Sequence, residues 1–182
     1  MRLLPIIFFA LLTIGCESTV DLSELVYQNG KYFLKGTETV FSGSVTGLES
    51  GSIEDGIKQG IWVENNMLGN KLAEGSYTDG YKTGPWKLFH EESGQLWKQG
   101  AYDAKGLKTG EWSTFGKDGI LWEKGNYAVD RQQGAWEYYH LNGNVRSRGI
   151  MTDGKRDGEW IKYDEEGLES ARKVWNKGTP VE

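Results

Sequence analysis

The chain has 182 residues and a mass of 20.5 kDa, which is enough for one ordinary domain or a short repeat array but not for two full enzymes. Its 26 Gly and 8 Trp, with only 37% hydrophobic residues, favour strands and tight turns. The net charge of −5 argues against a nucleic acid partner, because nucleic-acid-binding domains usually carry a basic excess. The single Cys excludes an internal disulfide, a CxxC redox pair and a Cys-rich zinc site.

Residues 1–15 have the pattern of a secretory leader. Arg2 precedes an apolar run of about a dozen residues, which is a typical signal-peptide length and is too short to span a bilayer. The run ends at Gly15, which directly precedes Cys16. This arrangement resembles a bacterial lipoprotein signal, which implies cleavage before Cys16 and a lipid anchor on that residue. The alternatives are an ordinary secretory signal and a buried cytosolic segment with an incidental Cys.

The lipid anchor determines the expected location. A chain held by acyl groups at Cys16 would lie in the bacterial cell envelope, facing the periplasm or the surface. Glu17 follows the Cys, not Asp, which by resemblance to the enterobacterial sorting rule favours the outer membrane. Residues 16–26 are predicted to be a tether, and residues 27–50 are predicted to form capping strands.

The body of the chain is an internal repeat. The triplet Gly-x-Trp occurs five times, and the spacings between its tryptophans are 24, 26, 24 and 24 residues. A fixed period of this length is typical of repeat architectures. A second marker, Gly-x-Tyr or a variant of it, begins at Gly51, Gly75, Gly100, Gly125 and Gly149. The repeat tryptophans are Trp62, Trp86, Trp112, Trp136 and Trp160.

Each repeat unit predicts two strands and two turns. In one unit, residues 136–140 form a strand, Asn142-Gly143 is a pair that tolerates positive φ, and residues 144–151 form the return strand. The absence of a helical period between turns predicts an all-β meander of antiparallel β-hairpins, with about eleven strands over residues 52–175 and two more over 27–45. The repeats cover residues 51–178 and leave a tail at 179–182. The two additional residues of the longest unit fall in 90–94 and 103–107, which we predict to be turns.

The repeat motif is similar to that of a known family. Gly-x-Trp-x-x-Tyr followed by Asn-Gly-x-Val, as in residues 134–145, resembles the MORN-repeat family and most closely its bacterial variant form. The resemblance implies an elongated, single-layer, twisted sheet. MORN proteins serve as scaffolds for proteins or are proposed to bind phospholipid, and members of the variant are often labelled antitoxins of toxin–antitoxin systems. The resemblance therefore implies a protein partner, whereas the acidic charge disfavours phospholipid.

The repeat tryptophans are expected to be structural. A single layer has nothing to pack on its faces, so its apolar residues must cover one another across neighbouring strands. We expect the five rings to form a stacked stripe that supplies the core. Alternation along a strand puts the Gly two residues before each Trp on the same face, where the missing side chain would let a neighbouring ring lie over the backbone.

Three aromatic residues outside this pattern are binding candidates. Trp97 and Trp122 occupy the same position of adjacent units, where other units have Ala73 and Arg146. Two such tryptophans would lie about 10 Å apart and could form a platform for a sugar, a peptide or a protein, with simple packing as the alternative. Tyr138 is a weaker candidate.

The sequence does not indicate an enzyme. His90 and His140 are the only histidines, and a separation of about four strands, or ~19 Å, keeps them from sharing a metal. The sequence has no HExxH, CxxC, P-loop or Gly-x-Ser-x-Gly motif, so no catalytic residue, metal or cofactor is expected. The favoured hypothesis is a membrane-anchored protein-interaction scaffold, antitoxin- or immunity-like. The alternative is a cell-wall or glycan-binding module, because wall-binding repeats also use hairpins rich in Gly, Trp and Tyr.

Overall fold

The computed structural model describes residues 18–181, so Cys16 and the predicted leader lie outside the described residues. Within them, the only helical element is the 3-10 turn η1 (Leu22–Glu24). The strands of the N-terminal part are β1 (Thr19–Asp21), β2 (Leu25–Gln28), β3 (Lys31–Leu34), β4 (Gly43–Thr46) and β5 (Glu49–Glu54). The strands of the repeats are β6 (Ile57–Asn65), β7 (Lys71–Thr78), β8 (Tyr81–Phe89), β9 (Leu96–Tyr102), β10 (Lys108–Phe115), β11 (Leu121–Ala128), β12 (Arg131–Tyr139), β13 (Val145–Thr152), β14 (Lys155–Tyr163), β15 (Glu169–Asn176) and β16 (Thr179–Pro180).

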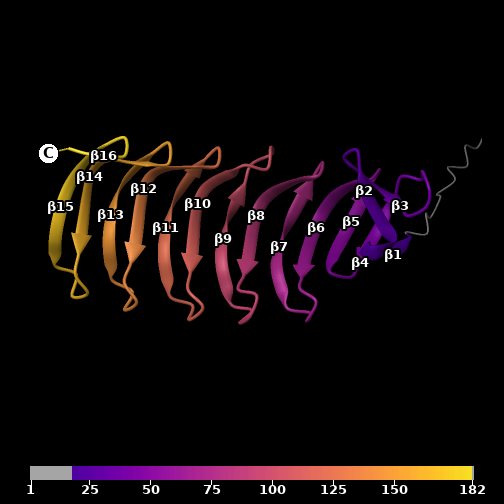
Figure 1. The fold of residues 1–182 in the computed structure, drawn as a ribbon, viewed down its shortest axis with the longest axis horizontal. Coiled ribbons are helices and arrows are strands. Elements are labelled where there is room, and N and C mark those ends of the chain that lie inside the picture. Colours follow the sequence, from indigo (N-terminus) through magenta and orange to yellow (C-terminus); the bar gives the residue numbers. More distant parts are fainter. Residues whose placement is uncertain (1–17, 182) are drawn as a thin grey trace, which may run out of the picture.

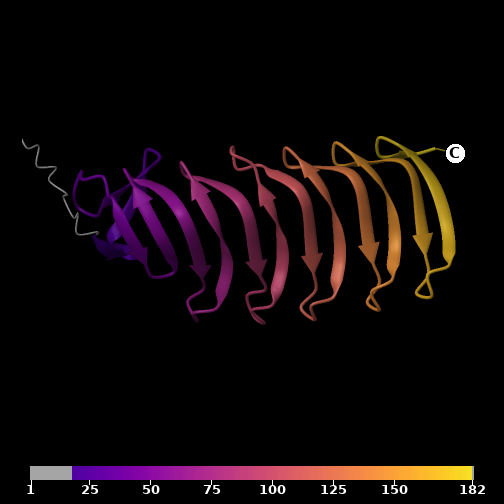
Figure 2. The same ribbon diagram turned by 180° about the vertical axis from the view of Figure 1, so that it is seen from behind.

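The strands form one long sheet and one small hairpin. The sheet has 14 strands in the order β1, β4, β5 and then β6 to β16 in sequence, while β2 and β3 pair separately. From β4 onward every strand pairs antiparallel with the next. Figures 1 and 2 show β6 to β15 as a long twisted row in a single layer. The predicted all-β hairpin array is confirmed, with the eleven strands β5 to β15 in the predicted interval.

The N-terminal cap begins earlier than the sequence suggests. Residues 16–26 are predicted to be a tether, but β1 pairs in parallel with β4 and Leu25 is only 6% exposed. Leu25, Phe41 and Ile53 form a hydrophobic cluster with Trp62, the first repeat tryptophan. The burial of Leu25 could not be predicted from the sequence, because Leu25 reaches an apolar environment only when the β2–β3 hairpin folds against the end of the sheet (Figure 1). Residues 19–26 therefore belong to the folded body.

The repeat tryptophans form the core, as predicted. All five are at most 4% exposed. Tyrosine rings alternate with them in edge-to-face contacts, so that Tyr77 lies 6.0 Å from Trp62 and 5.3 Å from Trp86 between ring centroids. The series continues through Tyr102 and Tyr127. Each such pair of rings stabilises the fold by about 0.5–1.5 kcal/mol beyond the effect of burying its surface area. The row of rings can therefore hold the strands together where a second layer would do so in other folds.

Each tryptophan ring covers a glycine, but not the predicted one. Gly84, two residues before Trp86, has a φ of 64° and open space where a Cβ would stand. The Trp86 ring instead covers Gly75, its direct partner on β7, where a Cβ would overlap the indole. The other such pairs are Gly51–Trp62, Gly100–Trp112, Gly125–Trp136 and Gly149–Trp160. The close approach that requires glycine is therefore between strands.

A β-bulge explains the role of the glycine before each tryptophan. Gly75 pairs with Trp86, but Ser76 pairs with Thr83, so the two residues before Trp86 have no partner on β7. The positive φ of Gly84 permits this bulge. The Ser76 carbonyl beside it accepts a hydrogen bond from Trp86 Nε1 at 3.1 Å. The other four tryptophans donate to equivalent carbonyls at 3.0–3.2 Å, so Gly-x-Trp acts as one unit.

The turns and the C-terminal end follow the same logic. Both predicted insertions lie in loops, residues 90–94 between β8 and β9 and residues 103–107 between β9 and β10. At the last unit, Lys173 pairs with Trp160, whereas the earlier units have a glycine at this register. A further tryptophan could not lie over Lys173 as the others lie over glycine, so the stack of rings ends at this strand.

Candidate functional site

One face of the sheet carries both the core and the variable residues. We call it the tryptophan face, because the five repeat tryptophans point to it. The second residue after each tryptophan points the same way, and these residues form what we call the second row: Glu64, Leu88, Thr114, Tyr138 and Lys162. We call the five repeat tryptophans the first row. The first row has the same side chain in every unit, while the second row has a different one in each. Chemistry specific to this protein therefore lies in the second row.

A further bulge adds one more side chain beside the second row in each unit. Thr114 pairs with Glu123 and Phe115 pairs with Leu121, which leaves Trp122 without a partner on β10. A bulge of this kind turns a side chain out of the regular alternation. The equivalent residues, taken in chain order, are Leu72, Trp97, Trp122, Arg146 and Ser170.

This register corrects the alignment of the units made from sequence. Trp97, Trp122 and Arg146 are equivalent, as expected, but Ala73 is not their counterpart. Ala73 pairs with Leu88 and is only 3% exposed. The counterpart is Leu72, one residue earlier, because the distance from the bulge to the following Gly-x-Tyr marker is the same in every unit.

The two candidate tryptophans have different surroundings. Trp97 is 37% exposed and Trp122 is 44% exposed. The imidazole of His90 lies 6.0 Å from the Trp97 ring, and Lys98 Nζ lies 4.5 Å from the same ring. Trp122 instead lies against Gly116, where an added Cβ would contact its indole. Trp97 is thus partly covered by its own unit, and Trp122 is the freer of the two.

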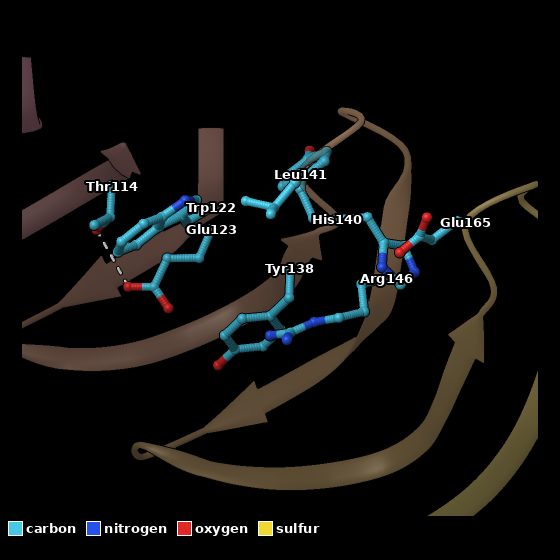
Figure 3. Close-up of a pocket in the computed structure, with 9 residues that line it drawn as sticks. Thr114, Trp122, Glu123, Tyr138, His140, Leu141, Arg146 and Glu165 are labelled. Carbon is cyan, nitrogen blue, oxygen red and sulfur yellow. Dashed lines mark hydrogen bonds between the residues drawn. The ribbon is translucent and has the colours of Figure 1, made fainter. Parts of the chain in front are cut away.

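Trp122 lines a cleft on the tryptophan face. The cleft has a volume of about 530 Å³ and lies between Trp122, Tyr138 and Arg146. Figure 3 shows Trp122 and Glu123 on one side and Arg146 reaching toward Tyr138 on the other. Thr114 Oγ1 donates a hydrogen bond to Glu123 Oε1 at 3.2 Å, which holds that carboxylate in place. The cleft therefore offers an exposed aromatic ring, a cation and a positioned acid to one ligand.

Tyr138 connects this cleft to the core. Its ring lies 6.2 Å from Trp136 and 6.1 Å from Trp160, where Met151 stands in place of the tyrosine of earlier units. Burial raises the pKa of the Tyr138 hydroxyl, with a smaller contribution from Glu123. The hydroxyl is therefore neutral at physiological pH and can donate a hydrogen bond into the cleft. Tyr138, the weakest binding candidate in the sequence analysis, is therefore the residue that joins the core to the cleft.

Two smaller cavities continue the same face toward the C-terminus. Each has a volume of about 370 Å³, and both are lined by Ser147, Arg156 and Lys162. Arg146 adds to the first and Lys173 to the second. Sequence reasoning missed this cluster because its members lie on β13, β14 and β15. The sequence did contain one indication of this cluster. Alternation along the strands places these basic residues on the tryptophan face, and no acidic residue stands beside them on that face.

The two histidines have structural contacts. His90 Nε2 lies 3.0 Å from the Phe115 carbonyl oxygen, and His140 Nε2 lies 2.9 Å from the Tyr163 carbonyl oxygen. Each imidazole therefore joins its own turn to the next unit. Over residues 18–181, no three His, Cys, Asp or Glu side chains are grouped so that they could hold a metal ion.

Comparison with known proteins adds no assignment. No protein-family model and no curated protein matches this chain. In the part of the chain that the structure describes, no helix is long and apolar enough to cross a membrane. The MORN-like resemblance and the lipid anchor at Cys16 stay predictions from their motifs.

Proposed function

We propose that this protein is a non-enzymatic interaction module of MORN-like repeats, anchored in the bacterial cell envelope through Cys16, that binds a protein on its tryptophan face. The observation that carries the proposal is the cleft where Trp122, Tyr138 and Arg146 meet. Trp, Tyr and Arg are the side chains that most often dominate binding energy at protein interfaces, above all in pockets.

The scaffold supports this role through its rigidity. Tyr138 is held between Trp136 and Trp160, and Trp122 belongs to a bulge in a strand that is paired on both sides. Binding groups placed on paired strands lose little conformational freedom when a partner docks. The repeat array therefore supplies a preorganised surface, while its second row supplies specificity.

Site-directed photo-crosslinking in cells tests the proposal. A photoreactive amino acid at Trp122 is expected to give one discrete crosslinked protein from the envelope fraction. The matched control places the same amino acid at Lys124, two residues away on the same strand, whose side chain pairs with Glu137 at 3.3 Å outside the cleft. Equal products from both positions, or none from Trp122, would contradict protein binding at the cleft.

A glycan is the alternative partner, since Trp122 could stack against a sugar ring. The surroundings of Trp97 disfavour a two-tryptophan platform, because Lys98 and His90 lie close to its ring. A pull-down on peptidoglycan decides between the two functions. Strong retention that is lost in the Trp97→Ala, Trp122→Ala double variant would favour the glycan module over the protein scaffold.

The anchor needs its own test. Intact mass and membrane fractionation of the native protein, beside a Cys16→Ala variant, should show a mature chain that starts at acylated Cys16 and is released by the substitution. An unprocessed soluble chain would contradict the anchor and leave a cytosolic antitoxin as the leading function. If the anchor is present, an antitoxin- or immunity-like role requires a toxin that acts in the periplasm or arrives from outside.

A further inference from the structure

The last two repeat units carry a cluster of cations on the tryptophan face. Arg146, Arg156, Lys162 and Lys173 line the two neighbouring cavities of about 370 Å³. We call these four residues the basic surface. Tyr138, Ser147 and Ser170 also line the first of these cavities, and no Asp or Glu lines either cavity.

The cations of the basic surface lack the counterions that earlier units provide. Lys58 pairs with Glu49, and Lys82 Nζ lies 3.4 Å from Glu64 Oε1. Arg156 occupies the position of Lys82 in the repeat, but the second row of the preceding unit holds Tyr138 where Glu64 stands before Lys82. Within residues 18–181, no ion pair involves any member of the basic surface.

The packing of Arg156 fixes its place without neutralising it. Its guanidinium carbon lies 4.5 Å from the centroid of the Trp160 ring and 5.2 Å from that of Trp175. Cation–π contacts hold the side chain against the core but leave its N–H donors free for an anion. Like charges gathered on one face repel one another, so the cluster favours an added anion over the empty surface.

We infer that the basic surface binds an acidic peptide segment of the protein partner, whose apolar side chain enters the neighbouring Trp122 cleft. This inference rests on the proposed function and names the chemistry of its partner. Arginine and lysine beside hydroxyl groups suit carboxylates, because hydrogen bonds between charged groups are short and strong. The exposed aromatic ring of Trp122 adds an apolar component that carboxylates alone would not use.

The extent of the surface favours an extended segment over a single small anion. The Trp122 cleft and the basic surface together run from Trp122 on β11 to Lys173 on β15, which is four strand spacings or ~19 Å at 4.8 Å each. About six residues of extended chain cover that distance at 3.3 Å per residue. One phosphate or carboxylate group would engage only one of the cavities.

Fluorescence anisotropy of the full-length chain in detergent tests the inference. The probe is a fluorescein-labelled peptide of alternating Glu and Tyr, with a peptide of alternating Lys and Tyr as its control. We expect binding of the Glu–Tyr peptide only, weakening as salt is added because salt screens exposed charges. Lys162→Glu should weaken binding about tenfold or more, because it places a like charge against the acidic segment.

The matched control variant is Arg148→Glu. Arg148 pairs with Ile161 in the register next to the Ser147–Lys162 pair, so its side chain points to the opposite face. It should change the affinity less than about twofold, because its charge lies across the sheet from the bound peptide. Circular dichroism melting of both variants shows whether each is folded, and a second loss variant, Arg146→Gln, removes charge without reversing it.

Three results would overturn the inference: no binding of the Glu–Tyr peptide by the native chain, equal losses in Lys162→Glu and Arg148→Glu, or stronger competition by inorganic phosphate or phosphatidylglycerol vesicles. The last would assign the cations to phosphoryl groups. The crosslink at Trp122 reports separately on the proposed function. A crosslinked protein without an acidic segment would leave the protein scaffold standing and overturn only the acidic partner.

Discussion

The first two and the last two repeat units share one core and differ in charge on the same face. In both regions a buried tryptophan covers a glycine and donates its Nε1 hydrogen to a carbonyl beside a bulge. In the early units Lys58 and Lys82 have acidic partners, whereas Arg156 and Lys162 have none among the described residues. The repeat thus separates two tasks. The first row holds the sheet together, and the second row is free to vary for binding.

The largest expected effect comes from breaking what the two regions share. Trp86→Ala and Trp136→Ala should each destabilise the fold by about 3–5 kcal/mol, because each removes a buried ring that its neighbours cannot replace. Urea unfolding followed by circular dichroism measures both. Similar losses would show that the core is equivalent in both regions, and an unchanged urea midpoint for Trp136→Ala would contradict the core assignment.

The glycine beneath each ring is expected to matter next. Gly75→Ala and Gly125→Ala should each cost about 2–3 kcal/mol, because the added Cβ overlaps an indole that is fixed to the backbone. Gly134→Ala is the control, since its Cβ meets open space and only its positive φ of 77° is strained, at a cost of about 1 kcal/mol. Tryptophan near-UV circular dichroism should change only for the first two variants. If Gly134→Ala instead destabilised the fold more than Gly75→Ala and Gly125→Ala, the result would support the sequence-based prediction that a ring lies over the glycine before each tryptophan.

One cation position distinguishes the fourth unit from the others. A Lys or Arg lies over the repeat tryptophan in four units, through Lys58, Lys82, Lys108 and Arg156, at 4.0–4.5 Å, but Gln132 stands at this position before Trp136. Gln132→Lys should stabilise the fold by about 0.5–1 kcal/mol through the missing cation–π contact. A melting temperature that falls would show that the contact does not stabilise the array.

The smallest effect comes from exchanging the charges that separate the regions. Lys162→Glu should raise stability by up to about 1 kcal/mol, because it places an acid in the two cavities that Arg156 also lines. Glu64→Lys should lower stability by a similar amount of about 1 kcal/mol or less, because it leaves Lys82 unpaired. Urea unfolding of the two variants measures this. A destabilising Lys162→Glu would assign Lys162 to the fold and not to binding.

The period of the sequence accounts for most of the architecture. Spacings of 24 and 26 residues between tryptophans, with Gly-containing turns between them, predict the strands and their antiparallel order. They also place the two insertions of the longest unit in loops. These features follow from local signals, since turn residues and strand alternation act over a few positions. The buried tryptophan row follows from them as well.

Contacts between side chains on neighbouring strands could not be predicted from these local signals. A bulge shifts the register, so Trp86 covers Gly75 and no ring lies over Gly84. A second bulge makes Leu72, and not Ala73, the counterpart of Trp97. Leu25 became part of the core only when the N-terminal hairpin folded against the sheet. The assembly of Arg146, Arg156, Lys162 and Lys173 likewise depends on three strands meeting. By itself the sequence determined the repeat, its strands and its core residues, because these depend on periodicity along the chain. Only the tertiary structure decided which side chains meet across strands, because alternation along one strand does not give the shifts in register that bulges make between strands.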